Sequence, residues 1–321
     1  MNPSRRAALA LAAGAAAASA FGQPAFPAKP VTMIVPFAPG GISDGAARVI
    51  AQALSDQWKQ PVLVDNRAGG GTITGTRDAA RAAPDGTTLL LTSFGYVMNQ
   101  LLVKNLPYEP QSLTALNMVG IAPNVLYLHP SLKLGTVAEV VAYARAHPGG
   151  LNFASSGNAS SPHIAAELFS SVTRTKNVHV PYRGTGPAMA DVLGGQVSGI
   201  FDTLQSLPYA RAGKLRAIAT TGKQRLAGAP DVPTFAESGY PELEIASWWG
   251  FFVPSGTPPA VQKQVTDAID RVLAAPEVRR KLEAVGLEPS TDTSPAAFRA
   301  FLDTEQRRWA ALVKERDIRM D

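Results

Sequence analysis

The sequence contains no cysteine among its 321 residues. This absence excludes disulfide bridges, zinc sites built on thiolates and cysteine nucleophiles together. Charged residues are also sparse at 17% of the chain, while hydrophobic residues make up 45%, a balance typical of a packed globular protein. After residue 20, no apolar run reaches the ~18 residues that a membrane-spanning helix needs.

Sequence motifs for catalysis are missing as well. The chain has no G-x-S-x-G elbow, no H-E-x-x-H pair, no P-loop and no histidine–carboxylate cluster with metal-ligand spacing. Of its four histidines, only His163 falls in a candidate binding loop. A histidine beside serines can activate a nucleophile, but the pattern shows no partner that would orient it. The sequence therefore predicts no enzyme, no cofactor and no metal site.

Positive charge is in slight excess but is not concentrated. The 30 lysines and arginines outnumber the 25 acidic residues, which gives a formal charge of +5. The densest basic groups, residues 279–281 and 307–308, lie in helical patterns beside glutamates and lack interleaved aromatics. They do not indicate a nucleic-acid surface, whereas the mild positive balance favours a small anionic ligand.

The first twenty residues have the layout of a secretory signal. Arg5 and Arg6 form a basic start, residues 7–18 are almost entirely alanine, leucine and glycine, and residues 18–20 offer a small-x-small cleavage site. The alternatives are an N-terminal anchor or a buried helix. The arginine pair also matches part of a twin-arginine start, so the export route stays open. We predict a signal peptide at residues 1–20 and a periplasmic protein.

The rest of the chain alternates short β-branched runs with helical patterns. Strands are predicted at 31–35, 62–64, 88–92, 125–128, 152–154, 178–180, 199–201 and 215–220. Helices are predicted at 44–58, 75–82, 137–147, 162–173, 187–193, 258–274, 276–285 and 295–314. This alternation predicts an α/β fold of largely parallel sheets, with ligands bound at strand carboxyl ends beside helix N-termini.

The length of the chain corresponds to about two domains. Boundaries are predicted near residues 121–124 and 244–250, so the chain crosses twice between the same two lobes. The first lobe is then discontinuous, and the hinge is made of strands.

The motif PFAPGGISD, from Pro36 to Asp44, falls where the first strand turns into a helix. Gly40 and Gly41 allow a ligand to approach the backbone closely, and Ser43 or Asp44 can cap the helix. A short glycine-rich turn at a helix N-terminus suits an oxyanion. The alternative is a plain strand-to-helix turn.

A second loop, SSGNASSPH from Ser155 to His163, also follows a strand and precedes a helix. Its serines, Asn158 and backbone N–H groups can bind a carboxylate without a cation. The alternative is an ordinary solvent-exposed polar loop.

Further candidate residues follow other strands. Tyr182 can cover a ligand with its ring, and Arg183 can pair with one, although a surface arginine is the favoured interpretation. Asp202 and Thr203 end a later strand, where Asp202 can accept from a ligand hydroxyl or amine or cap a helix. Thr92 and Ser93 end the third strand and face the same crevice, whereas Trp248 and Trp249 are interpreted as core between the lobes.

Read together, these segments resemble the substrate-binding proteins of the tripartite tricarboxylate transporter group, the Bug family. The matching segments are PFAPGGISD (36–44), VDNRAGGG (64–71), APDGTTLLL (83–91), NLPYEP (105–110), GNASSPHIAAELF (157–169), VPYRGTGPAMADVLGGQV (180–197), GKLRAIATTGKQR (213–225), PDVPTFAESG (230–239) and FFVPSGTPPAVQ (251–262). No single segment is diagnostic, but their common order is specific and spans nearly the whole mature chain.

The resemblance implies a type II periplasmic-binding-protein fold, with residues 21–122 and 248–321 as lobe 1 and residues 123–247 as lobe 2. It implies that loops of both lobes hold one carboxylate, partly through ordered waters, and that the protein delivers it to membrane transporter subunits as a monomer. Carried onto this sequence, the ligand-binding residues are Pro39, Gly40, Gly41, Asp44, Thr92, Ser93, Ser156, Gly157, Asn158, Ser160, Ser161, His163, Tyr182, Gly184, Asp202 and Thr203.

The chain departs from the family pattern in three places. Ala159 stands where the family often has glycine, and Asn99-Gln100 replaces the usual Asn-Pro. Residues 95–97 also differ from a more polar run that lines the distal pocket in the family. Specificity therefore does not transfer from any relative, and Tyr96 is a candidate for favouring a flat or aromatic acid.

The leading prediction is a periplasmic receptor that captures a small carboxylate for a tripartite tricarboxylate-type transporter. One alternative is a sensor subunit that passes the same binding event to a membrane kinase. A second is an exported hydrolase that uses Ser160 and His163. Turnover of a bound ligand separates the hydrolase from the receptor, and identification of the partner separates sensing from transport.

Overall fold

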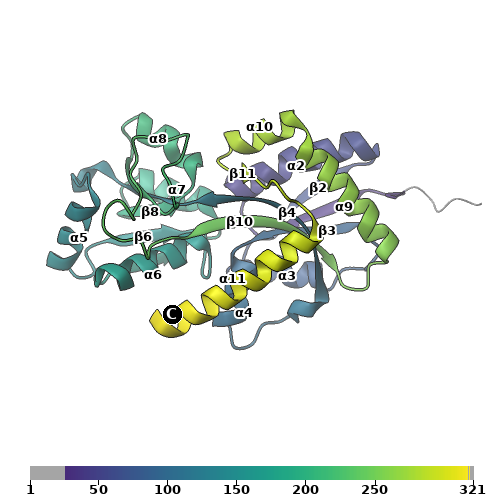
Figure 1. Ribbon diagram of the computed structural model, residues 1–321, viewed down its shortest axis with the longest axis horizontal. Coiled ribbons are helices and arrows are strands. Elements are labelled where there is room, and N and C mark those ends of the chain that lie inside the picture. Colours follow the sequence, from purple (N-terminus) through teal and green to yellow (C-terminus); the bar gives the residue numbers. More distant parts are fainter. Residues whose placement is uncertain (1–25, 317, 319–321) are drawn as a thin grey trace, which may run out of the picture.

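The computed structural model describes residues 26–316 and residue 318. Two mixed β-sheets organise it, and we call the part built on each sheet a lobe (Figure 1). The first lobe has six strands in the order β11-β4-β10-β3-β1-β2. These strands are β1 (Val31–Val35), β2 (Val62–Asn66), β3 (Thr88–Ser93), β4 (Leu113–Pro123), β10 (Ala246–Pro254) and β11 (Glu288–Pro289).

The second lobe is built on a five-stranded sheet in the order β7-β6-β8-β5-β9. Its strands are β5 (Val125–Leu128), β6 (Asn152–Ser155), β7 (Val178–Pro181), β8 (Gly199–Asp202) and β9 (Arg216–Thr220). The predicted α/β fold with two lobes is confirmed.

The prediction of largely parallel sheets is wrong. Strand β1 runs parallel to β2 and β3, but β10 runs antiparallel to both β3 and β4. In the second lobe, β6 is parallel to β7 and β8, while β5 is antiparallel to β8 and β9. In the first lobe, β10 runs opposite to β3 and β4 because β4 takes the chain to the second lobe and β10 brings it back.

Helices cover both sheets (Figure 1). The first lobe carries α2 (Ile42–Trp58), α3 (Ile73–Ala80), α4 (Gly95–Leu102), α9 (Pro259–Ala274), α10 (Pro276–Ala284) and α11 (Pro295–Arg316). The second lobe carries α5 (Val137–Ala146), α6 (Ser161–Thr173), α7 (Thr185–Leu193) and α8 (Leu207–Arg211). Helix α2 shows why the pattern works, since Ala46, Ala47, Ile50 and Leu54 form one buried stripe at helical spacing.

The two crossing strands join the lobes. Strand β10 pairs with β4 from Ala246, opposite Pro123, to Pro254, opposite Leu113. Helix α11 packs on β4 and α4, and the rings of Trp309 and Phe94 meet at 5.0 Å. The predicted lobe boundaries at 122/123 and 247/248 fall at the end of β4 and the start of β10 and stay a prediction.

The predicted signal peptide at residues 1–20 lies outside the described residues. Within residues 26–316 and 318, no helix has the length and apolar character to cross a membrane.

Candidate functional site

A small cavity lies between the lobes, where strands of both sheets end. Its volume is about 20 Å³, which is room for about one water molecule. The residues around it are Phe37, Ala38, Gly41, Ile42, Ser43, Ser93, Asn124, Ser156, Ser160, Ser161, Pro162, Thr185, Asp202, Thr203, Ser247 and Trp249. Loops after β1, β3, β6 and β8 supply most of them, so a larger ligand enters only when the lobes separate.

Three helix N-termini meet at this cavity. Helices α2, α6 and α7 begin there behind the N-cap residues Gly41, Ser160 and Gly184, and none of these residues caps its helix with a side chain. By contrast, α5 begins away from the cavity and has a complete capping box between Thr136 and Glu139. First-turn N–H groups and the positive ends of three helix dipoles are therefore directed to one space, which favours an anion.

Hydroxyl groups add neutral donors to the same wall. The Ser161 hydroxyl oxygen accepts from Asn124 Nδ2 at 2.6 Å, and that of Ser43 accepts from Trp249 Nε1 at 2.8 Å. Each serine therefore keeps its own proton to donate. The Thr185 hydroxyl also lines the cavity, and no hydrogen bond joins it to the other described residues.

Asp202 has a different character from the rest of the wall. Of the described residues that line the cavity, it alone carries a charge, and it is 2% exposed. Burial raises its pKa to about 6, although hydrogen bonds from the Ser206 hydroxyl and the Thr203 backbone act in the opposite direction. No lysine, arginine or histidine among the described residues forms an ion pair with it.

Asp44 supports the first loop from behind. Its Oδ2 accepts from the Gly40 N–H and from Arg48 Nε, both at 3.1 Å. Burial raises the pKa of Asp44, but the hydrogen bonds from Arg48 and Gly40 outweigh it, and the pKa lies below its ordinary value. Gly40 adopts a φ of +91°, in the region that favours glycine. Both residues shape the loop without lining the cavity.

His163 supports the second loop in the same way. Its Nδ1 accepts from the Ala159 N–H at 3.1 Å, and its ring stacks on that of His179 at 3.9 Å. Burial, together with His179, lowers the pKa of His163 to about 3, so the ring is neutral near pH 7. Ala159 adopts a φ of +59°, a left-handed conformation for which glycine is better suited.

The hydroxyl of Ser160 gives no support to the hydrolase alternative. It donates to the Gly157 carbonyl at 2.6 Å, and among the described residues it forms no hydrogen bond with His163. A nucleophile and its base need such a bond or a water between them.

Only part of the predicted site lines the cavity. The predicted residues that do so are Gly41, Ser93, Ser156, Ser160, Ser161, Asp202 and Thr203. Those that lie outside its wall are Pro39, Gly40, Asp44, Thr92, Gly157, Asn158, His163, Tyr182 and Gly184. The Tyr182 hydroxyl donates to Asp191 of its own lobe, so its ring does not cover the cavity.

Several lining residues were missed by the sequence-based prediction. Thr185 and Pro162 stand inside the motifs that were singled out, directly at helix starts, and that position was the available signal. Ser247 and Trp249 carry no such signal, because strand pairing brings them in and sets Trp249 opposite Ser93. Tyr96 was a candidate for ligand selection, but its ring packs on Phe252 at 4.5 Å inside the first lobe.

The rims of the two lobes touch each other around the cavity. The Ala38 N–H donates to the Arg183 carbonyl at 2.9 Å, and Gln205 Nε2 donates to the Gly40 carbonyl at 3.3 Å. Glycines allow the contact: a Cβ at Gly186 would lie 2.9 Å from the Pro39 carbonyl oxygen, closer than real contacts permit. The structure is thus a closed state, and we call this glycine-lined contact the seam.

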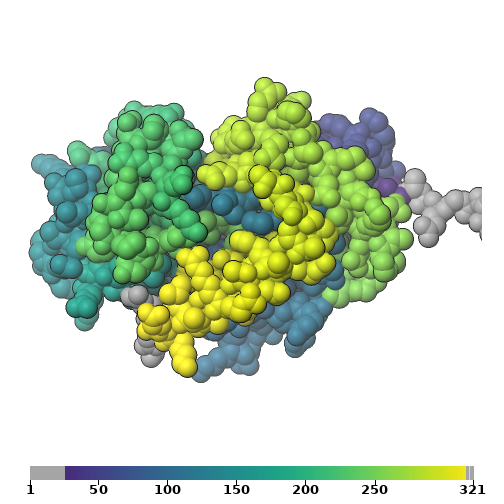
Figure 2. Space-filling model, viewed as in Figure 1, coloured from purple at the N-terminus to yellow at the C-terminus, as the bar shows by residue number. Residues whose placement is uncertain are grey.

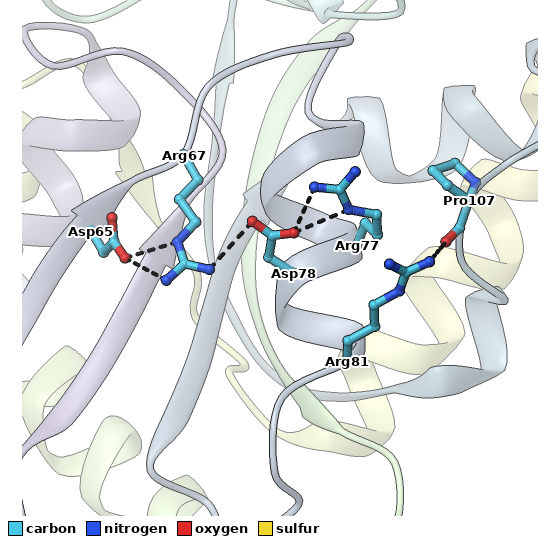
Figure 3. Close-up of polar contacts among 6 residues, drawn as sticks. All are labelled: Asp65, Arg67, Arg77, Asp78, Arg81 and Pro107. Atoms are coloured by element: carbon cyan, nitrogen blue, oxygen red, sulfur yellow. Dashed lines mark hydrogen bonds and ion pairs between the residues drawn. The ribbon is translucent and has the colours of Figure 1, made fainter.

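A third loop of the first lobe, residues 67–72, reaches the seam after β2. Figure 3 shows Arg67 between Asp65 of β2 and Asp78 of α3, at 2.8 and 3.3 Å. Arg77 also pairs with Asp78 at 2.8 Å. These contacts fix the loop that brings Gly71 against the Asn158 carbonyl, where an added Cβ would lie 2.3 Å away.

A larger, open groove lies between the lobes on the other face of β10. It has a volume of about 540 Å³, and Figure 2 shows it as a hollow between the green second lobe and yellow α11. The lining residues are Ile121, Pro123, Thr221, Gly222, Lys223, Gln224, Arg225, Leu226, Ala227, Glu244, Ile245, Ala246, Trp248, Glu288, Phe301, Glu305 and Arg308. Ala246 and Trp248 face the groove, while Ser247 and Trp249 face the cavity, as strand alternation requires.

Two α/β lobes, joined by paired strands and closed over a cavity at helix N-termini, define the class of two-lobed solute-binding proteins. The chain belongs to one family of this class. The model described as "Tripartite tricarboxylate transporter family receptor" matches residues 46–318, and the family resemblance noted in the sequence is confirmed.

Individual relatives agree with this assignment. Protein BugT of Bordetella pertussis is 39% identical over 294 residues, covering 90% of each chain. R. palustris Rpa4515 with adipate is 32% identical with a TM-score of 0.88, over 92% of this chain and 99% of that one. MatC from Rhodopseudomonas palustris with bound malate is 31% identical with a TM-score of 0.85, over 90% and 100%.

Proposed function

We propose that the protein captures a small carboxylate in the cavity between its lobes and delivers it to the membrane subunits of a tripartite tricarboxylate-type transporter. The observation that supports this most strongly is the meeting of three uncapped helix N-termini, from both lobes, at one enclosed space. An anion there satisfies N–H groups of both lobes together, so binding stabilises the closed state.

Neutral hydrogen-bond donors suit a ligand that must later be released. No cation lines the cavity among the described residues, so the anion is held by N–H and hydroxyl groups alone. Each hydrogen bond to a charged group contributes about 1.5–3 kcal/mol. The adipate and malate bound to the two R. palustris relatives are both carboxylates, which supports the same ligand class here.

The proposed ligand contacts combine predicted and newly located residues. From the first lobe we propose Gly41, Ser43 and Ser93. From the second lobe we propose Ser156, Ser160, Ser161, Thr185, Asp202 and Thr203. The other predicted residues, among them Pro39, Gly40, Asp44, Gly157, Asn158, His163 and Gly184, would hold the loops and the seam in shape.

We further propose a periplasmic location, a monomer and no catalysis. The location is supported by the signal-like pattern at residues 1–20 and by the transport receptors of the family. The absence of catalysis is supported by the hydrogen bonds of Ser160 and His163, which join each side chain to a backbone group and not to the other. Incubation with a bound acid should return it unaltered, and a chemically changed product would contradict the proposal.

The ligand class is tested by a thermal-shift screen of the chain from residue 21 onward against mono-, di- and tricarboxylates, aromatic acids and amino acids. Neutral sugars of similar size serve as controls. A ligand at a hundred times its Kd adds about 2.7 kcal/mol of stability. At least one acid should raise the melting temperature; a shift with sugars and with no acid would overturn the proposal.

A further inference from the structure

Asp202 is hard to reconcile with a plain anion site. It ends β8, lines the cavity at 2% exposure, and faces the same space as three helix N-termini. A ligand carboxylate in that space would meet a second negative charge. Buried ionised groups are costly unless they are paired or fully hydrogen-bonded.

The protein itself supplies little compensation for this carboxylate. The Ser206 hydroxyl donates to Oδ2, and the Thr203 backbone supplies a second donor. A carboxylate accepts at about four positions, so acceptor capacity is left over. Ion pairing gives no further help, since the cations of the described second lobe that form ion pairs do so with other acids.

The other residues next to Asp202 do not fill this capacity. Among the described residues, no hydrogen bond joins the Thr203 hydroxyl to the Asp202 carboxylate, and the one bond of that hydroxyl is accepted from the Gln205 N–H at 3.3 Å. The Ser160 hydroxyl is directed to the Gly157 carbonyl. Donors on the opposite wall, such as Ser43, belong to the other lobe and approach only on closure.

We propose that Asp202 is a specificity-determining residue that selects carboxylates carrying an additional hydrogen-bond donor, a hydroxyl or an ammonium group. This inference rests on the proposed function. The helix N-termini bind the carboxyl group, and the second donor of the ligand pairs with Asp202. A plain acid leaves Asp202 facing a like charge without a partner, so it binds more weakly.

The test compares acids that differ in one substituent. The chain from residue 21 onward is titrated calorimetrically at pH 8 with succinate, malate and aspartate, and with propionate, lactate and alanine. In the series that binds, the hydroxy or amino acid should bind at least about tenfold more tightly than the plain acid, since a hydrogen bond to a charged group is being compared with none. Comparing malate with aspartate, or lactate with alanine, shows whether the hydroxyl or the ammonium group is preferred.

The variant Asp202→Asn removes the charge and keeps an acceptor for Ser206. It should reduce the preference to less than about threefold, with the plain acid binding more tightly than to the wild type. Asp231→Asn, an exposed aspartate of the same lobe, should retain the wild-type preference. Should Asp202→Asn fail to fold, Ser206→Ala takes its place: it deprives Asp202 of a donor and should enlarge the preference.

The outcomes separate the two proposals. If plain acids bind the wild type as tightly as their hydroxy and amino analogues, or if Asp202→Asn keeps the preference, the selectivity inference is overturned and carboxylate binding stands. If no carboxylate binds the wild type at all, the proposed function and the inference are both overturned.

Discussion

The two spaces between the lobes differ in almost every respect, although one strand forms part of both. The cavity on the Ser247 side of β10 measures about 20 Å³ and has no cation among the described residues of its wall, whereas the groove on the Trp248 side measures about 540 Å³. Lys223, Arg225 and Arg308 line the groove. Counting only these cations would place an anion in the groove, although Glu244, Glu288 and Glu305 line it as well.

The pairing of donors reverses that expectation. In the groove, Arg225 already pairs with Glu237 at 3.0 Å, and Lys223 lies 3.7 Å from Glu244. In the cavity, the helix N-termini and Thr185 keep unused donors at a site where both lobes meet. The comparison teaches that enclosed neutral donors without partners, and not the nearest cations, identify an anion site.

The largest effect is expected from Gly41→Val. A Cβ at Gly41 would already lie 3.4 Å from the Thr185 Cβ, and the two valine methyl groups would fill the cavity and cover the α2 N-terminus. Carboxylate affinity should fall at least about a hundredfold, a loss of two or more hydrogen bonds to a charged group. Calorimetry measures the loss, and exposed Gly135→Val is the matched control. Retained affinity would remove the first loop from the site.

The pH dependence of the unfolding free energy tests the burial of the Asp202 carboxylate in the cavity. The folded pKa of Asp202, about 6, lies above its unfolded value near 3.8, so ionisation destabilises the folded state. Without ligand, Asp202→Asn should exceed the wild type in unfolding free energy by about 1–3 kcal/mol at pH 8. That advantage should shrink through pH 6 and vanish below about pH 4. Urea unfolding at each pH measures it, and a constant difference would contradict the burial argument.

Thr185→Val tests a neutral donor of the cavity with little change in shape. The hydroxyl has no partner among the described residues, so the folded protein should lose no stability. Affinity should fall about tenfold, equivalent to one hydrogen bond to a charged group. Calorimetry and a thermal melt measure the two effects. A variant that binds as tightly as the wild type would show that Thr185 donates nothing to the ligand.

Gly186→Ala tests the seam without touching the cavity. Gly186 lies in the first turn of α7, where alanine favours the helix by up to about 1 kcal/mol. The new Cβ would meet the Pro39 carbonyl only in the closed state. Affinity for every carboxylate should fall about fivefold, a shift of about 1 kcal/mol toward the open state, with an unchanged or higher melting temperature. Unchanged affinity would mean that closure does not need the seam.

The smallest effect is expected from Lys223→Met in the groove. Lys223 is an exposed cation whose ion pair with Glu244 contributes little to stability. Carboxylate affinity should change less than about twofold. A loss as large as that of Gly41→Val would place the anion in the groove and reverse the comparison.

The local part of the fold could be predicted from the sequence. Glycine, proline and serine mark the loops after β1 and β6, and helical spacing gave α2, α9 and α11 within a few residues. Strands β4 and β10 were expected only as hinge strands near residues 121–124 and 244–250, without strand bounds, because their apolar runs carry no period that identifies a pairing partner. Their pairing is long-range, and it sets β10 antiparallel to both β3 and β4.

The same limit applies to the site. Gly41 and Ser161 lie in loops after strands and Asp202 ends one, so their positions, together with the family resemblance, marked them as candidates. Asp44 and His163 stand in the same motifs, yet their side chains turn toward Arg48 and His179. Sequence order does not reveal which side of a loop a side chain faces, since that depends on packing partners far along the chain.

The most direct test is a crystal structure of the chain from residue 21 onward, grown with the carboxylate that gives the largest thermal shift. The account predicts the carboxyl group between the N-termini of α2, α6 and α7, with a second donor of the ligand within hydrogen-bond distance of Asp202. An acid bound in the groove beside Lys223 and Arg308, with the cavity unaltered, would contradict it.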